Sequence, residues 1–593
     1  MSTLNSNFKY LIILPLIACV SFSCKGAEPE VIPDAPTNVA TPTYNNVSIS
    51  TDKAVYKPGD NVTFTIAYSS LPTTAKVRYK YANTTISESN ITGSTWSWTT
   101  PASDFKGYIA EVYSLSNNVE TIYATIGIDV SSSWSKFPRY GFLSEFGQLS
   151  DDNINAVINN LNRYHINGLQ FYDWQNKHHK PLPMSGSVPA SSWKDIGNRD
   201  IYFSTVEKYI NAAHSYNMKA MFYNLVYGAW DYAEADGVNK EWYIFTDNTH
   251  TNRDIFALSS PFLSNLNLLD PGNTGWQNYM ANETKNVYKY LSFDGYHMDQ
   301  LGDRGTRYKY DGSFENLGTS FKPYIDAIKA AVPEKYNVMN AVAQYGQSSI
   351  AAASSDFLYT EVWSPSDGFS DLANIIKQNN VLGNNTKNTV LAAYMNYDKA
   401  NSVGYFNTPS ILMTNAVIFA FGGDHLELGE HMLCKEYFPN SNLTMKDDLK
   451  QALVNYYDFL VAYQNLLRDG GTFNSVTITS TDNKLSISAW PAAQGKVAVF
   501  GKKFDNSQVI HLINFTNSTT QQWRDKNGIQ VLPALVKDAK LLLTSDKTVK
   551  NIWIATPDIA GGASRKLNFA QIGNKVSFIL PELRYWDMVV VEY

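Results

Sequence analysis

Residues 293–302 read Phe293-Asp294-Gly295-Tyr296-His297-Met298-Asp299-Gln300-Leu301-Gly302. This stretch predicts a short strand ending in an acid, because side chains alternate along a strand and Gly295, His297 and Asp299 then share one face. A carboxylate at the C-terminal tip of a strand, followed by a Gly-containing loop, is where a (β/α)8 barrel places its catalytic groups. The alternative is an Asp that only starts a turn, since its side chain bonds the local backbone.

Strand and helix patterns alternate on both sides of this stretch. The predicted strands are residues 168–174, 219–225, 267–270, 294–299, 337–342, 357–363, 389–396 and 416–421. Predicted helices include residues 201–216, 275–291, 320–331 and 372–378, and an earlier helix contains Ile154, Val157, Ile158 and Leu161 behind an Asp151-Asp152 cap. Eight strands with helices between them predict a (β/α)8 barrel over residues 133–470, rather than an open doubly wound sheet.

Acids end three of these strands, at Asp173, Asp299 and Glu361. Strand tips converge at the mouth of a barrel, so acids that are distant in sequence can face one another. Two carboxylates across one bond are what glycoside hydrolysis needs, and their mutual repulsion raises one pKa and so supplies a proton donor near neutral pH. Strand-tip position alone adds Asn224, His297, Gln300, Asn340, Trp363 and Asn396 as pocket candidates.

Short alternating strands flank the predicted barrel. Residues 41–132 predict an Ig-like β-sandwich, in which Val62, Phe64 and Ile66 alternate with threonines. Residues 471–593 predict a C-terminal antiparallel β-sandwich. Neither region has a cluster of catalytic type, so for the first region structural support is favoured over sugar binding.

Composition limits the kind of partner. The chain has 593 residues with a formal net charge of −6, which is small for this length and argues against nucleic acid as the main partner. Aromatic residues make up 13%, including 38 Tyr and 13 Trp. Aromatic rings stack on the flat faces of sugars, so this composition suits a neutral polysaccharide, although large β-sandwiches are also rich in tyrosine.

The N-terminus predicts secretion. Lys9 precedes an apolar run too short to span a bilayer, followed by Ser23-Cys24-Lys25. Residues 1–24 therefore resemble a bacterial lipoprotein signal in which Cys24 is lipidated, with a plain cleaved signal or a membrane anchor as alternatives. The Pro- and acid-rich residues 25–40 predict a linker. The expected location is the cell envelope, on an outer membrane lipid anchor that is periplasmic or surface-exposed.

Three motifs together resemble glycoside hydrolase family 66, which contains dextranases and cycloisomaltooligosaccharide glucanotransferases. They are Gln170-Phe171-Tyr172-Asp173-Trp174, Gly295 to Gly302 with Asp299-Gln300-Leu301-Gly302, and Tyr359-Thr360-Glu361-Val362-Trp363. The order of sandwich, barrel and sandwich is also similar to that family, over essentially the whole mature chain.

The resemblance implies a retaining endo-hydrolase of the α-1,6 bonds of dextran and isomaltooligosaccharides. Asp299 would be the nucleophile and Glu361 the general acid/base, while Asp173 would bind sugar hydroxyls with Tyr172 and Trp174 beside it. The resemblance implies that glucanotransferases of the family are longer and have a sugar-binding domain inserted in the barrel. This chain has no room for that domain, so hydrolysis is favoured over cyclisation or transglycosylation.

Other clusters are expected to be structural. His178-His179-Lys180 predicts a solvated surface, and the run from Asp424 to His431 predicts loop structure or sugar hydrogen bonding, since it lacks the spacing of an HExxH metal site. Core positions are expected for Trp134, Trp230, Trp276 and Trp523. No cofactor or metal is expected. A non-catalytic glycan-binding lipoprotein and a hydrolase of another α-glucan linkage remain as alternatives.

Overall fold

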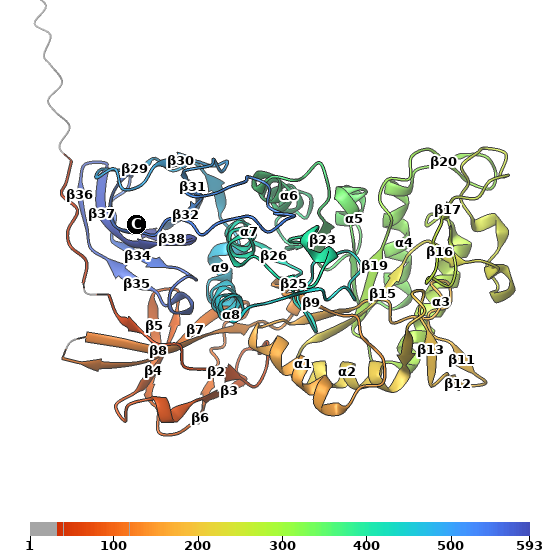
Figure 1. Ribbon diagram of the computed structural model, residues 1–593, viewed down its shortest axis with the longest axis horizontal. Helices are drawn as coiled ribbons and strands as arrows, with labels where there is room; N and C mark the ends of the chain where they lie inside the picture. Colours follow the sequence, from red (N-terminus) through yellow and green to blue (C-terminus); the bar gives the residue numbers. More distant parts are fainter. Residues whose placement is uncertain (1–31, 40, 118) are drawn as a thin grey trace, which may run out of the picture.

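The structure, a computed structural model, describes residues 32–39, 41–117 and 119–593. The sheets at the two ends of the chain lie together on one side of the molecule, beside the middle part of the chain in which strands and helices alternate (Figure 1). Within the described residues, no helix combines the length and the apolar character needed to cross a bilayer. The predicted signal sequence with Cys24 lies outside these residues, and residues 32–39 of the predicted linker contain no helix or strand.

The first region contains two mainly antiparallel sheets that share one core. The first sheet has the strand order β1 (Thr43–Tyr44), β8 (Val119–Val130), β7 (Lys106–Ser116), β4 (Lys76–Tyr81), β5 (Thr84–Asn90). The second sheet has the order β2 (Ile49–Thr51), β3 (Asn61–Ile66), β6 (Thr95–Thr99). Along β3, Val62, Phe64 and Ile66 are buried and alternate with exposed residues, which confirms the predicted period of two.

The central region is built on two parallel sheets. The first of them has the strand order β22 (Tyr336–Met339), β19 (Gly295–Asp299), β15 (Lys219–Leu225), β10 (Gly168–Phe171), β9 (Tyr140–Leu143). The second has the order β23 (Leu358–Glu361), β24 (Thr389–Ala392), β26 (Gly423–His425). A parallel bridge between Asn340 and Tyr359 joins the sheets at one edge. At the other edge Phe142 in β9 donates its N–H to the carbonyl of Leu428, just after β26.

Helices follow these strands and pack against them. They are α1 (Asp151–Arg163), α2 (Phe203–Ser215), α3 (Thr274–Tyr290), α4 (Leu317–Ala331), α5 (Gln347–Ala351), α6 (Phe369–Leu382), α7 (Thr408–Ala420), α8 (Asp447–Ala462) and α9 (Gln464–Leu467). The apolar face predicted for α1 is confirmed, since Ile154, Ile158 and Leu161 are buried. Its cap is Ser150, whose side chain accepts the N–H of Asn153, and the two predicted cap residues occupy the first turn instead.

One predicted strand is a helix, and another is a strand that lies outside the parallel sheets. Residues 416–421 lie largely in α7, which is buried on all sides, and a short apolar run cannot be told from a buried helix by its period alone. Residues 267–270 contribute to β18 (Leu266–Leu268), which pairs antiparallel with β16 (Gly228–Trp230) and β17 (Ile255–Phe256), outside the parallel sheets. The parallel strands that the sequence analysis missed are β9 and β26.

Short hairpins and further sheets complete the chain. Small paired strands are β11 (Met184–Ser185), β12 (Val188–Pro189), β13 (Ser192–Lys194), β14 (Asp200–Tyr202), β20 (Arg307–Tyr308), β21 (Phe314–Glu315), β25 (Gly404–Tyr405) and β27 (Leu443–Thr444). The last region has a seven-stranded sheet of β28 (Thr472–Asn474), β31 (Val497–Lys503), β32 (Ser507–Asn514), β38 (Trp586–Glu592), β34 (Asn551–Ala555), β35 (Arg565–Leu567) and β30 (Ile487–Ala489). Facing it across a shared core is a four-stranded sheet of β29 (Ile478–Ser480), β33 (Val536–Thr544), β37 (Lys575–Leu583) and β36 (Phe569–Ile572).

Candidate active site

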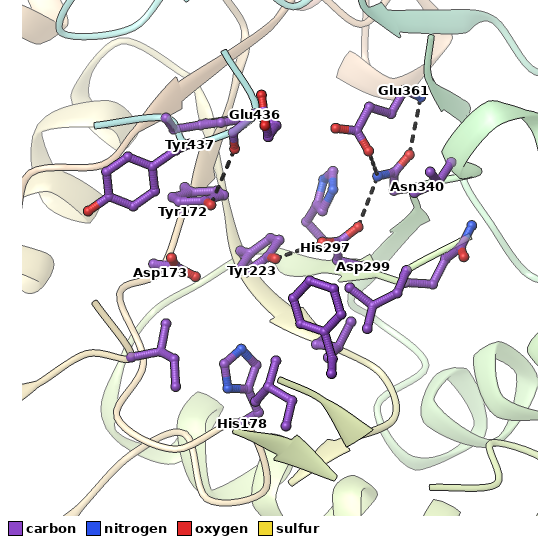
Figure 2. Close-up of a pocket in the computed structure, with 18 of the residues that line it drawn as sticks. Tyr172, Asp173, His178, Tyr223, His297, Asp299, Asn340, Glu361, Glu436 and Tyr437 are labelled. Atoms are coloured by element: carbon purple, nitrogen blue, oxygen red, sulfur yellow. Dashed lines mark hydrogen bonds between the residues drawn. The ribbon is translucent and has the colours of Figure 1, made fainter. Parts of the chain in front are cut away.

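Asp299 and Glu361 end β19 and β23, and their carboxylates point toward the same amide (Figure 2). The Asn340 side-chain nitrogen donates to Asp299 Oδ1 at 2.9 Å and to Glu361 Oε2 at 3.2 Å. Because both oxygens bond one nitrogen, they lie within about 6 Å of each other. The Asn340 side-chain oxygen in turn accepts the backbone N–H of Glu361 at 3.2 Å. One amide therefore sets the relative position of two acids that are distant in sequence.

Each carboxylate has a second donor of its own. The Tyr223 hydroxyl donates to Asp299 Oδ2 at 2.7 Å, and the Tyr394 hydroxyl donates to Glu361 Oε1 at 2.7 Å. Both tyrosines are buried, and burial raises the pKa of each hydroxyl well above its usual value. They therefore remain donors throughout the neutral range.

The two acids have unequal proton affinities. Burial, and then the charge of Asp299, raises the pKa of Glu361 to about 7. Burial also raises the pKa of Asp299, but the hydrogen bonds from Tyr223 and Asn340 oppose that rise. Asp299 therefore ionises first and helps to keep a proton on Glu361 near neutral pH, which is the division of roles that acid/base chemistry needs.

Both carboxylates open into a cleft of about 680 Å³. Apolar and aromatic side chains form much of its lining, namely Ile196, Tyr223, Leu225, Phe256, Leu258, Pro261, Phe262, Leu266, Tyr359, Trp363, Tyr394, Tyr437 and Phe438. The lining also includes the polar side chains of Gln170, Asp173, His178, His297, Gln300, Asn340 and Glu436. A cleft with broad ring surfaces and a few convergent polar groups suits a neutral, ring-shaped ligand such as a sugar.

Asp173 lies in the same cleft, just past the end of β10 (Figure 2). Its φ of 49° is in the left-handed region, which a non-glycine residue rarely adopts and which is common at functional sites. Burial, and then the nearby charge of Asp195, raises the pKa of Asp173 to about 7, whereas Arg199 lowers it. This third acid is thus a polar group on the lining that changes charge near neutral pH.

The cleft brings together most of the candidates derived from the sequence. Its lining includes Tyr172, Asp173, His297, Asp299, Gln300, Asn340, Glu361 and Trp363. His297 is neutral at the pH of interest, because burial lowers its pKa to about 3, and its ring stacks on Tyr140.

Trp174, Asn224 and Asn396 do not line the cleft, so these three predictions are wrong. The Trp174 ring is fully buried in the core, where its indole N–H donates to the carbonyl of Tyr223. Asn224 is buried on the opposite face of β15 and donates to the carbonyl of His178. Asn396 has a φ of 53°, which turns its side chain toward Ser410 and the carbonyl of Asp525.

The prediction of a solvated surface at residues 178–180 is also wrong. His178 and His179 are buried, and His178 lines the cleft, where it accepts the indole N–H of Trp230. Burial lowers the pKa of His178 to about 3, so the ring is neutral. The segment is therefore part of the cleft floor.

The predictions for the tryptophans and for the run from Asp424 to His431 differ in outcome, because Asp424 and His425 lie in strand β26 and not in the predicted loop. Buried positions are confirmed for Trp134, Trp230, Trp276 and Trp523. In the run from Asp424 to His431, Asp424 accepts the N–H of Tyr140, while His425 and Glu427 bond buried partners such as Asn415. These contacts make the run a structural network beneath the cleft. Across the described residues, no group of three or more His, Cys, Asp or Glu side chains is arranged to hold a metal ion.

Several residues that bond the two acids or form the cleft wall were not among the candidates predicted from the sequence. Tyr223 is opposite His297 in the register of β15 and β19, so strand alternation would have placed it, rather than its neighbour Asn224, on the face of Asp299. Tyr394 comes two residues after Ala392, the last residue of β24. The wall made by Phe256, Phe262 and Tyr437 comes from the end of the two-residue strand β17 and from two loops, whose positions no periodicity encodes.

A protein family and several known proteins match most of this chain. A family model described as glycosyl hydrolase family 66 matches residues 51–590. A cycloisomaltooligosaccharide glucanotransferase of Niallia circulans is 28% identical over 97% of this chain and 74% of its own length. A dextranase of Streptococcus salivarius is 24% identical over 79% of this chain and 65% of its own length.

A solved structure is similar over nearly the whole chain. It is the crystal structure of a cycloisomaltooligosaccharide glucanotransferase of Paenibacillus sp. in complex with cycloisomaltoheptaose. The TM-score is 0.84 at 26% identity, and the match covers 92% of this chain and all of the other.

Proposed function

Because this chain belongs to glycosyl hydrolase family 66, we propose that it is a retaining endo-dextranase, which hydrolyses internal α-1,6 bonds of dextran to isomaltooligosaccharides. The observation that carries the proposal is the Asn340 amide, which bonds both carboxylates through one nitrogen. The resulting separation, within about 6 Å, agrees with the roughly 5–5.5 Å of retaining glycosidases and is below the roughly 6.5–9.5 Å of inverting ones.

The mechanism assigns one role to each acid. Asp299 attacks the anomeric carbon while Glu361 gives its proton to the departing glycosidic oxygen, which leaves a glucosyl ester on Asp299 and a carboxylate on Glu361. That carboxylate then removes a proton from water, and the water oxygen displaces Asp299 with a second inversion. The pKa of about 7 for Glu361 supports this assignment, because the same group must both give and take a proton.

Asp173 is assigned to substrate binding rather than to bond cleavage. Its place in the cleft, with Tyr172 beside it, supports hydrogen bonds to hydroxyls of the sugar at the cleavage point. The ring surfaces of Phe256, Phe262 and Tyr437 would carry further glucose units of the chain.

The architecture belongs to the same proposal. The two parallel sheets, which meet at both edges, support a closed (β/α)8 barrel whose strand ends form the cleft. The paired sheets with shared cores at residues 43–130 and 472–592 support an Ig-like and a C-terminal β-sandwich.

A second candidate function is the cyclising transfer reaction for which the relative from Niallia circulans is named. The alignment with that relative runs over 737 positions, more than the 593 residues of this chain, so the relative has inserted segments here. The lack of these segments here supports hydrolysis, because the resemblance to the family implies an additional sugar-binding domain in its cyclising members. A purely glycan-binding role would not require a pair of acids of unequal pKa.

Lipid attachment through Cys24 is a proposal from the sequence alone. It would place the protein in the cell envelope, at the outer membrane, with dextran or isomaltooligosaccharides as its partners. Metabolic labelling with an alkyne fatty acid tests it: label is expected on the wild type and not on Cys24→Ala.

Dextran, pullulan and starch incubated with the pure protein test the enzymatic proposal. We expect only dextran to give isomaltooligosaccharides, with the first products in the α-anomeric form by ¹H NMR. Asp299→Asn is expected to abolish release. An initial burst of β-anomer, or release by Asp299→Asn equal to the wild type, would reject the proposed mechanism.

A further inference from the structure

A loop of the C-terminal region, residues 521–530, packs against the strand ends that carry Glu361 and Tyr394. The Trp523 indole N–H donates to the carbonyl of Ser366 at 2.7 Å. The backbone of the loop also bonds the two segments, since Phe369 donates to the carbonyl of Gln521, and Asn396 to that of Arg524. This loop connects β32 to β33 and is therefore distant from the central strands in sequence.

Arg524 is the residue of this loop that reaches closest to the acids. Its side chain is buried, with 4% of the residue exposed. One guanidinium nitrogen donates to the carbonyl of Val362 at 2.7 Å, and another donates to the carbonyl of Tyr394 at 3.1 Å. Val362 directly follows Glu361, and the Tyr394 hydroxyl is the donor to Glu361. The planar fork of a guanidinium can hold two such carbonyls in one fixed geometry.

The same guanidinium also supports the wall of the cleft. It lies 4.9 Å from the ring centre of Trp363, which lines the cleft, and 4.6 Å from that of Trp523. The side chain is thus enclosed between two indole rings.

We propose that Arg524 is a positioning residue for the reaction: it acts through Val362 and Tyr394 to hold Glu361 in place for proton transfer. The C-terminal region thereby completes the active site rather than only stabilising the chain. This inference rests on the proposed role of Glu361 as general acid/base.

Two substrates distinguish positioning from a general loss of structure. Dextran has a poor leaving group that needs the proton of Glu361, whereas a 4-nitrophenyl α-isomaltooligoside releases a stable anion that needs little assistance. For Arg524→Ala we expect kcat/KM to fall about 10²- to 10³-fold on dextran, the range of a general acid, and less than about tenfold on the nitrophenyl substrate. Equal losses on both substrates would overturn the proposal.

Three further variants serve as controls. Glu361→Gln must itself spare kcat/KM on the nitrophenyl substrate, which reports formation of the glucosyl ester, although kcat falls because Glu361 is also the base for hydrolysis of that ester. If kcat/KM is not spared, the proposed role of Glu361 fails, whereas a failure of Arg524→Ala alone rejects only this inference. Arg524→Lys keeps the charge but cannot hold both carbonyls, so an intermediate loss on dextran is expected. Lys526→Ala, at an exposed position of the same loop, is expected to match the wild type.

A crystal structure of Arg524→Lys provides a readout independent of turnover. We expect the distance between the Tyr394 hydroxyl and the Glu361 carboxylate to exceed about 3.5 Å, the limit of a hydrogen bond. An unchanged bond of 2.7 Å in that variant would overturn the proposal.

Discussion

Asn340 is the residue on which the geometry of the two acids depends most directly. Its side chain makes three bonds, two to the carboxylates and one to the backbone of Glu361. For Asn340→Ala we expect kcat on dextran to fall about 10²- to 10³-fold, as when one preorganised donor is removed from an active site. Steady-state kinetics measures the effect, and circular dichroism checks the fold. A kcat within twofold of the wild type would contradict this role.

Tyr394 adjusts the proton affinity of Glu361. Its hydroxyl lowers the pKa of Glu361, so in Tyr394→Phe that pKa rises above the wild-type value of about 7. Because Glu361 must be protonated to act as an acid, activity is lost as pH rises through its pKa. The alkaline limb of kcat/KM against pH should therefore move to higher pH in Tyr394→Phe. A limb that stays in place or moves to lower pH would contradict the assignment.

At the residue scale, the sequence predicts the two acids and Asn340, which bonds both, but not the two tyrosines that donate to them. Asp299 and Glu361 could be found because each ends a strand next to a recognisable motif. Tyr223 could have been found from strand alternation, because it shares the register position of His297. The bond from Tyr394 to Glu361 depends on how two strands approach each other, and no local pattern contains that information.

Strand β19 carries Asp299, and its first residue shows how closely the elements pack. A Cβ on Gly295 would lie 2.4 Å from the carbonyl oxygen of Tyr336 and 2.6 Å from the thioether of Met221. Gly295→Ala should therefore displace the strand, lower the free energy of unfolding by about 1–3 kcal/mol, and reduce kcat on dextran. Gly93→Ala is the matched control, because a Cβ there meets nothing within 4 Å. Denaturant titration is the measurement, and equal midpoints for the two variants would contradict the expectation.

At the element scale, period and length decided which predictions succeeded. The amphipathic helix α1 was predictable because its 3.6-residue repeat is local, whereas β19, whose first four residues are all buried, was predictable from the acid and the loop motif at its end. The segment at residues 416–421 was misassigned because α7 is buried on all sides and has no polar face. Strand β9 has four buried residues and was missed for the same reason, since it has no alternation.

The whole molecule depends on contacts between regions that lie far apart in sequence. Strands β7 and β8 approach α8 so closely that a Cβ on Gly107 would lie 2.0 Å from the carbonyl oxygen of Val461. Such contacts join the first sheets to the central region, as Arg524 joins the last sheets to it. Sequence patterns predict the order of these regions, but they do not encode which surfaces meet, because tertiary packing sets that choice.

Asp458 in α8 is a charged residue of the central region that also bonds the first region. Its carboxylate accepts the N–H of Gly127 in β8 at 2.9 Å and forms an ion pair with Arg163 at 2.8 Å. His165 adds a hydrogen bond at 2.7 Å. Burial works to raise the pKa of Asp458, but the charge of Arg163 and the bond from His165 outweigh it, so the pKa lies below its usual value.

The depressed pKa predicts how stability changes with pH. Asp458 stabilises the folded state fully at any pH above its pKa in the unfolded chain, which is near 4. This stabilisation is lost as the pH falls through the lower pKa that Asp458 has in the folded protein. In Asp458→Asn this stabilisation is absent at every pH, and the partly buried Arg163 loses its charged partner, so the free energy of unfolding should fall by about 1–3 kcal/mol at pH 7. Calorimetry of both proteins from pH 7 to pH 3 measures the difference in Tm. That difference should narrow below pH 4, and a constant or widening gap would show that Asp458 stabilises the junction by packing rather than by charge.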